Sequence, residues 1–178
     1  MFNTIRQRFR DVRTINALFS GAEKLANATG QKEAGAEHLV LSALELPDGT
    51  ARKAFERIHA DPNSFRAAIA RQYEDALHNI GIALPPDVVI TDEATPVAAG
   101  KGLFKAQASF DTLMQTLYEV KNKEHKTDSA APLLGAHVIL AATTAQYGVA
   151  VRAFRAMGAD PTKLAEAARA EIVESRMA

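Results

Sequence analysis

The stretch Gly35–Ile69, GAEHLVLSALELPDGTARKAFERIHADPNSFRAAI, decides the fold because the chain contains a second version of it. The second version is Leu134–Ala168, LGAHVILAATTAQYGVAVRAFRAMGADPTKLAEAA, which aligns without a gap at an offset of 99 residues. Between positions 37 and 68, eleven of the 32 aligned residues are identical. Five of these are alanines, which count for little in an alanine-rich chain, so the weight falls on six other pairs: His38/His137, Leu41/Leu140, Gly49/Gly148, Phe55/Phe154, Asp61/Asp160 and Pro62/Pro161. An internal repeat of this kind sets the architecture.

Each copy has the pattern of several short helices. Residues 39–46 are almost all apolar, which predicts a buried helix, because an exposed helix needs a polar face. A Pro-Asp-Gly turn follows at 47–49, since proline fixes φ and glycine allows a positive φ. Asp61-Pro62 and Asp160-Pro161 then predict the start of a fourth helix, with aspartate as the cap and proline at the first helical position. The apolar stripe expected on the first of these helices is Phe65, Ile69, Tyr73, Ala76 and Leu77.

The sequence therefore predicts an all-α fold of eight helices, arranged as two four-helix repeats related by a pseudo-twofold axis. We expect one domain over residues 1–178, with the first repeat at about 10–78 and the second at about 109–175.

Prolines and glycines interrupt the helical pattern between the repeats, so residues from about 79 to 108 are predicted to form a linker. Within it, residues 88–90 are expected to form a short extended piece. Ser109 is expected to cap the first helix of the second repeat, and the polar run 121–129 is expected to be a loop.

Composition limits the class of protein. Twenty-one basic and 21 acidic residues give a net charge of zero, so no overall field favours nucleic acid. The chain has no cysteine, which excludes disulfides and cysteine-ligated zinc and fits a cytoplasmic location. No run of residues approaches the roughly 18 apolar residues of a membrane span.

Two charged segments allow more than one interpretation. Residues 2–13 alternate large apolar side chains with arginine, which is typical of a solvated helix face, the reading we favour, or of a membrane-surface anchor or targeting peptide. Residues 121–126 contain three lysines and a histidine that would suit an anion or a partner protein. Acidic residues interleave with them, which favours an ordinary solvated segment.

The residues that begin each buried helix resemble those of the Clp N-terminal (Clp R) repeat domain, found at the front of the ClpA, ClpB and ClpC unfoldases. In that family a Thr-Glu-His-Leu-Leu type of sequence begins the buried helix of each repeat. Here Gly35-Ala36-Glu37-His38-Leu39 follows that pattern with alanine in place of threonine, and Gly135-Ala136-His137-Val138 is a more divergent version. The resemblance covers nearly the whole chain, up to Ile172.

The resemblance implies a non-catalytic protein-binding module of the Clp protease and chaperone system. We expect a stand-alone member without the ATPase modules of the unfoldases, because Gly100-Lys101-Gly102 lacks the spacing of a phosphate-binding loop. Such a protein would be an adaptor or regulator that recognises substrates or competes with an unfoldase N-domain. Its partners would be a Clp-type AAA+ unfoldase or its substrates and adaptors, with no nucleic acid and no membrane. The alternative is a protein that sequesters peptides or small molecules without a Clp partner.

Glu37 is the candidate ligand-binding residue, together with its neighbours Ala36 and Gly35. In ClpC-type domains the glutamate at this position contacts the guanidinium of phosphoarginine, and the resemblance extends that role to Glu37 alone, because Ala136 stands in the second copy. The competing interpretation, which we favour, is a carboxylate that stabilises the start of its helix through the helix dipole, by well under about 1 kcal/mol.

His38 and His137 occupy the same position in the two copies, which predicts a structural hydrogen bond within each repeat. The other histidines lack metal-ligand spacing and no catalytic serine motif occurs, so we predict no metal, cofactor or catalytic residue. A hydrolase that uses Glu37 and His38 is a further possibility, supported only by their adjacency. The other repeat positions expected to be structural are Phe55, Phe154, Asp61 and Asp160.

Overall fold

The computed structural model describes residues 2–79, 81, 106–125 and 131–177. Over these residues it contains eight α-helices, and the only β-structure is an isolated bridge between Ala34 and Ala106. The predicted all-α fold of eight helices is therefore confirmed. The predicted extended piece at 88–90 and most of the predicted linker lie outside the described residues.

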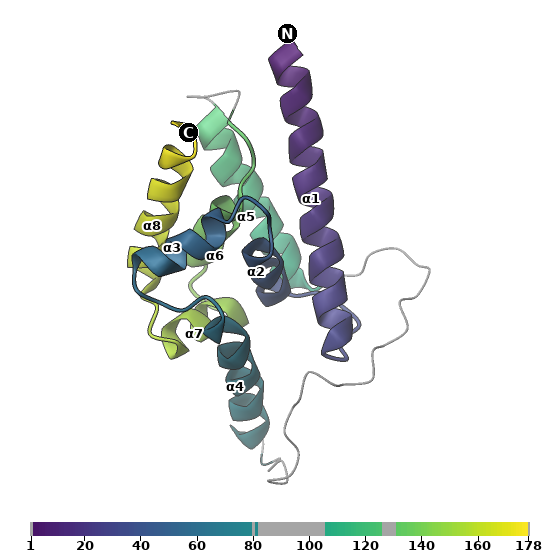
Figure 1. Cartoon of the computed structure of the whole chain (residues 1–178). Helices are drawn as coiled ribbons and strands as arrows, with labels where there is room; N and C mark the ends of the chain where they lie inside the picture. Colours follow the sequence, from purple (N-terminus) through teal and green to yellow (C-terminus); the bar gives the residue numbers. More distant parts are fainter. Residues whose placement is uncertain (1, 80, 82–105, 126–130, 178) are drawn as a thin grey trace.

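The helices follow one another in two sets of four, which Figure 1 shows in sequence colours. The first set is α1 (Phe2–Ala28), α2 (Ala36–Leu44), α3 (Thr50–Arg57) and α4 (Ser64–Asn79). The second set is α5 (Ala108–His125), α6 (Gly135–Thr144), α7 (Val149–Ala156) and α8 (Pro161–Glu174).

Local sequence signals set most of the helix ends. The chain leaves α1 through Gly30, whose φ of 73° lies in the left-handed region, and α3 begins after Gly49, whose φ is 66°. Helix α8 begins at Pro161 as predicted, because the Asp160 carboxylate accepts from the backbone N–H groups of Thr162 and Lys163 at 2.8 and 3.1 Å. These two bonds hold the pKa of Asp160 below its usual value.

Three predicted boundaries were wrong. Helix α4 begins at Ser64 rather than Pro62, and residues 62 and 63 form a turn in which the Asp61 carboxylate accepts from Asn63 N–H. Residues 121–125, expected in a loop, continue α5. Ser109 does not cap α5 but lies within it, and its hydroxyl accepts from the N–H of Ala36 at 3.3 Å.

The two sets of helices do not form separate bundles, because the third and fourth helices of the first set pack on helices of the second set. Helix α1 packs on α2 and α5 on α6, within their own sets, whereas α3 packs on α8 and α4 packs on α7. Helices α2 and α6 meet at the centre. Arg57 of α3 also forms two ion pairs with α8, to Glu171 at 2.7 Å and to Glu174 at 2.8 Å. The repeats therefore share one core.

A cluster of three phenylalanines lies where the exchanged helices meet. The rings of Phe55 on α3 and Phe154 on α7, which are equivalent positions of the repeat, have centroids 5.7 Å apart. Phe65 of α4 stacks on Phe154 at 5.0 Å. All three side chains are fully buried, so their burial stabilises the assembly of both repeats at once.

One pair of equivalent junctions is not symmetric. Helix α6 packs along α8 over much of its length, whereas α2 contacts α4 at only a few residues. The second half of α4 projects from the bundle (Figure 1), so Ala76, expected in the buried stripe, is exposed, and Tyr73 and Leu77 are only partly buried. The gap between α2 and α4 contains a cavity.

Candidate functional site

The starts of α2 and α6 are stabilised by the two repeat histidines. Nδ1 of His38 accepts from the backbone N–H of Gly35 at 3.0 Å, and Nδ1 of His137 accepts from that of Leu134 at the same distance. Each imidazole thus closes a capping box three residues after the cap residue. An Nδ1 atom that accepts carries no proton, which places the proton of the neutral ring on Nε2.

Polar side chains from the other repeat complete these helix starts. The N–H of Ala136 donates to Oγ1 of Thr50 at 2.9 Å, and the N–H of Gly135 donates to the Asp48 carboxylate at 3.1 Å. At α2 the equivalent partner is Ser109, with a longer bond to Ala36. Each buried helix therefore receives, from a residue of the other repeat, the hydroxyl that its own first residues lack.

Glu37 is buried rather than presented to solvent. Glu37 is only 2% exposed, and its Oε1 atom accepts a hydrogen bond from the Tyr73 hydroxyl of α4 at 2.6 Å. A Cβ atom at position 35 would lie 2.5 Å from Oε1, so glycine at this position leaves room for the carboxylate where it lies. Burial, and then the bond to Glu37, raises the pKa of Tyr73 well above its usual value, so the phenol stays protonated and donates.

His38 lies directly beside this pair and is neutral at pH 7. Burial lowers its pKa, Glu37 acts in the opposite direction, and Arg66 lowers the pKa further. Nδ1 of His38 is 3.5 Å from the Glu37 carboxylate. That contact is not an ion pair at neutral pH, because the same nitrogen accepts the Gly35 N–H and therefore carries no proton.

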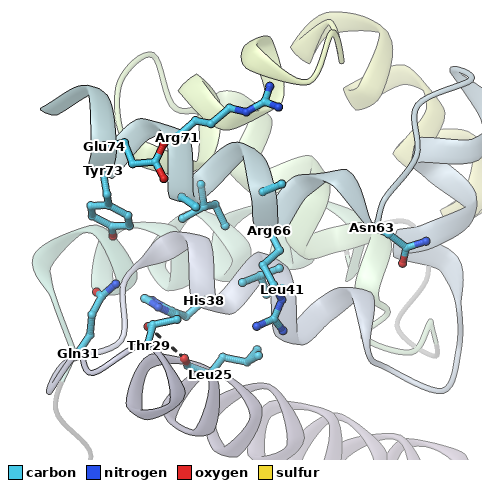
Figure 2. A pocket seen from close by; sticks show the side chains of 13 residues that line it. Leu25, Thr29, Gln31, His38, Leu41, Asn63, Arg66, Arg71, Tyr73 and Glu74 are labelled. Atoms are coloured by element: carbon cyan, nitrogen blue, oxygen red, sulfur yellow. Dashed lines mark hydrogen bonds between the residues drawn. The ribbon is translucent and has the colours of Figure 1, made fainter. Parts of the chain in front are cut away.

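A cavity of about 630 Å³ opens between the end of α1, α2 and α4, with His38 and Tyr73 in its wall. Figure 2 shows Arg66 reaching from α4 towards α1, across the cavity from His38. The apolar wall combines leucines from α1 and α2 with isoleucine and alanine from α4: Leu25, Leu41, Ile69, Ala67 and Ala70. The remaining lining residues are Thr29, Gln31, Asn63, Arg71 and Glu74.

A second, more polar depression of about 490 Å³ lies between the α6–α7 turn and the start of α8. Tyr147, 86% exposed, stands at it, together with the Asp160 cap. Within the described part of the chain, no three potential ligands gather as a metal site would require. None of the helices described there has the length and apolarity to cross a bilayer.

The sequence pointed to Glu37 and His38 but not to their partners. Tyr73 was predicted only as part of the apolar stripe of its helix and Arg66 was not singled out, because their approach to α2 depends on how α4 packs. A signal for Tyr73 did exist: at the 99-residue offset Tyr73 aligns with Ile172 as Glu37 aligns with Ala136, so two polar residues in one copy are both apolar in the other.

Comparison with known families places the first copy. A family model described as the Clp repeat (R) N-terminal domain matches residues 13–96. The match contains α2, α3, α4, most of α1 and the whole wall of the cavity. The second copy lies beyond it.

Proposed function

We propose that this chain, whose residues 13–96 match the family model of the Clp repeat (R) N-terminal domain, is a non-catalytic adaptor or regulator in a Clp protease or chaperone system. Domains of this family are protein-interaction modules, and the family match is the observation that carries the proposal. The module would recognise substrates, or compete with the N-domain of a Clp-type AAA+ unfoldase for them. We further propose that it works in the cytoplasm, where a chain without cysteine is at no disadvantage.

The junction of α2 and α4 is the proposed contact region, with Glu37 and its neighbours Gly35 and Ala36 as the predicted ligand-binding residues. The Glu37 carboxylate does not itself line the cavity, but it binds the hydroxyl of Tyr73, which does. Its buried position supports a role in orienting Tyr73. A partner segment that enters the cavity would therefore contact Tyr73 rather than the Glu37 carboxylate itself.

Affinity purification of the tagged protein from its own cells, followed by mass spectrometry, tests the proposal. We expect a Clp-type AAA+ unfoldase, its protease or its adaptors to be enriched with the wild-type bait. Glu37→Ala should reduce that enrichment, and Glu166→Ala, which changes an exposed glutamate on α8, should leave it intact.

Tyr73→Phe serves as a second bait, because it removes the bond to Glu37 and keeps the ring. Circular dichroism of each variant shows whether a loss of enrichment reflects unfolding. If the folded wild-type protein enriches no Clp component under gentle conditions, the adaptor proposal is wrong, and sequestration of peptides or small molecules becomes the better account.

A further inference from the structure

In the first repeat an arginine links the end of the second helix to the start of the fourth. Arg52 of α3 donates from Nε to the carbonyl of Leu44, the last residue of α2, at 3.0 Å. It also donates from Nη1 to Oδ1 of Asn63, the residue before α4, at 3.1 Å. The last carbonyls of a helix have no acceptor role within it, and a guanidinium supplies both donors and a favourable charge there.

The second repeat lacks this guanidinium. At the offset of 99 residues Val151 stands in the place of Arg52, and its apolar side chain is 2% exposed. The positions that accept from Arg52 in the first repeat are Thr143 and Thr162 in the second. Both line the polar depression of about 490 Å³ between the end of α6 and the start of α8. The depression is therefore the counterpart of the space that Arg52 fills.

The end of α6 has too few hydrogen-bond donors. The hydroxyls of Thr143 and Thr144 donate back to the carbonyls of Leu140 and Ala141, at 2.8 and 2.7 Å. Over the part of the chain that the structure describes, no group donates to the carbonyl of Thr143 itself. The final carbonyls of a helix also carry the negative end of its dipole. This end of α6 consequently favours a positively charged donor.

Two side chains of the depression favour the same kind of ligand. The Oδ1 atom of Asp160 accepts from the N–H groups of Thr162 and Lys163, whereas Oδ2 accepts from none of the described residues. The lowered pKa of Asp160 keeps this carboxylate ionised at neutral pH. Tyr147 lines the same depression with 86% of its surface exposed, and the face of a tyrosine ring attracts a guanidinium.

One charge opposes a cation in the depression. Arg155 of α7 lines it and is exposed, and it forms no hydrogen bond or ion pair with any described residue. The equivalent position of the first repeat carries Glu56. Arg155 therefore lowers the affinity for a cation without itself supplying the missing donor, which makes it a useful position for a test.

We propose that this depression binds the side chain of an exposed arginine on a partner protein. The guanidinium donates to the carbonyl of Thr143 and to Oδ2 of Asp160, and it stacks on the ring of Tyr147. It takes the place in the second repeat that Arg52 takes in the first. The site is separate from the junction of α2 and α4, so the proposal stands with or without a Clp-type partner.

NMR titration of the isotope-labelled full chain with three blocked amino acids tests the proposal. The probes are N-acetyl-arginine N-methylamide and its citrulline and lysine analogues. We expect the arginine probe to shift the amide signals of Thr143, Tyr147 and Thr162, with an affinity about tenfold above that of citrulline, which keeps the shape but not the charge. The lysine probe should bind more weakly than arginine, because an ammonium group cannot span two acceptors as a planar guanidinium does.

Equal affinities for arginine and citrulline would overturn the proposal, as would no shifts with the arginine probe at about 50 mM. Equal affinities for arginine and lysine would overturn the assignment of a guanidinium site, because any cation would then suffice.

Matched variants locate the site. Tyr147→Ala should weaken binding of the arginine probe about twofold to fivefold, and Tyr118→Ala, at an exposed tyrosine of α5, should leave it unchanged. Arg155→Glu, which copies Glu56, should tighten binding. Val151→Arg should abolish it by placing a guanidinium of the chain itself in the depression. Circular dichroism checks the folding of this variant, since Val151 is buried, and the other two variants decide the outcome if it does not fold. Unchanged affinity in Tyr147→Ala or weaker binding in Arg155→Glu would contradict the proposal.

Discussion

The two copies of the repeat build the junction between their second and fourth helices in different ways. In the second copy Ala136 and Ile172 are both buried, and α6 packs along α8. In the first copy the equivalent positions carry Glu37 and Tyr73, joined by a hydrogen bond, while α2 and α4 separate around a cavity. One helical frame therefore supports a closed apolar junction and an open polar one.

The comparison predicts that the polar pair acts as a unit. A buried carboxylate without a hydrogen-bond donor is costly, and so is a buried phenol without an acceptor. Alanine and isoleucine need neither, and the small alanine lets α8 approach α6. The open junction consequently depends on two residues from different helices, and the closed one depends on shape.

A carboxylate placed in the closed junction between α6 and α8 should have the largest effect on the free energy of unfolding. Ala136 is 0% exposed and the residue equivalent to Tyr73 is the apolar Ile172, so Ala136→Glu should lower the free energy of unfolding by about 3 kcal/mol or more. Urea denaturation measures the change. Ala156→Glu, at an exposed alanine of α7, is the control and should change stability little. A fully stable Ala136→Glu protein would show that the closed junction accommodates charge, which would break the comparison.

Breaking the polar pair in the open junction should have a smaller effect. Glu37→Ala leaves the Tyr73 hydroxyl without its acceptor and should lower stability by about 1–3 kcal/mol. The double variant Glu37→Ala with Tyr73→Ile copies the second repeat and should recover part of the loss. A double-mutant cycle by urea denaturation measures the coupling. Strictly additive effects would mean that the two residues do not act together.

The two hydrogen bonds that residues of the other repeat make to the starts of α2 and α6 should contribute differently to the free energy of unfolding. Thr50 binds the start of α6 at 2.9 Å in a buried site, so Thr50→Ala should lower stability by about 1 kcal/mol. Ser109 binds the start of α2 at 3.3 Å in an exposed site, so Ser109→Ala should cost only a few tenths of that. Thermal unfolding of both variants tests the order, and the reverse order would contradict it.

Acidification should produce a small loss of stability through His38. Its pKa is lowered in the folded protein, so below a pH of about 6.5 the unfolded chain binds a proton that the folded chain does not. Stability should be constant for this group above that pH and should fall as the pH drops towards the lowered pKa. His38→Asn, which keeps an acceptor for Gly35 N–H, should flatten this part of the pH profile. His78→Asn, at an exposed histidine, should not.

The sequence predicted the helices better than the way they meet. The apolar residues of α2, the turn at Gly49 and the Asp160-Pro161 cap act through neighbours in the chain, so the elements they predict are present. Two of the failures occurred where the tertiary structure decides the outcome. Ser109 looked like a cap for its own helix but bonds to Ala36, 73 residues away. Ala76 matched the apolar period of α4 but lies beyond the end of the core.

The candidate site was predicted in part for the same reason. Glu37 and His38 stand at the start of a helix whose position the repeat makes evident. The residues that face them, Tyr73 and Arg66, come from α4, and nothing local indicates how far α4 stands from α2. The cavity itself has no sequence signature, because it is the space left where α2 and α4 fail to pack.

The sequence by itself determined the two copies, the eight helices and the residues that begin each buried helix, because hydrophobic period, turn residues and caps are short-range properties. Only the tertiary structure decided that the copies exchange helices, that Thr50 and Ser109 serve helices far from them, and that one junction is open. Those features depend on contacts between residues distant in the chain, where the fit of whole surfaces decides which groups meet.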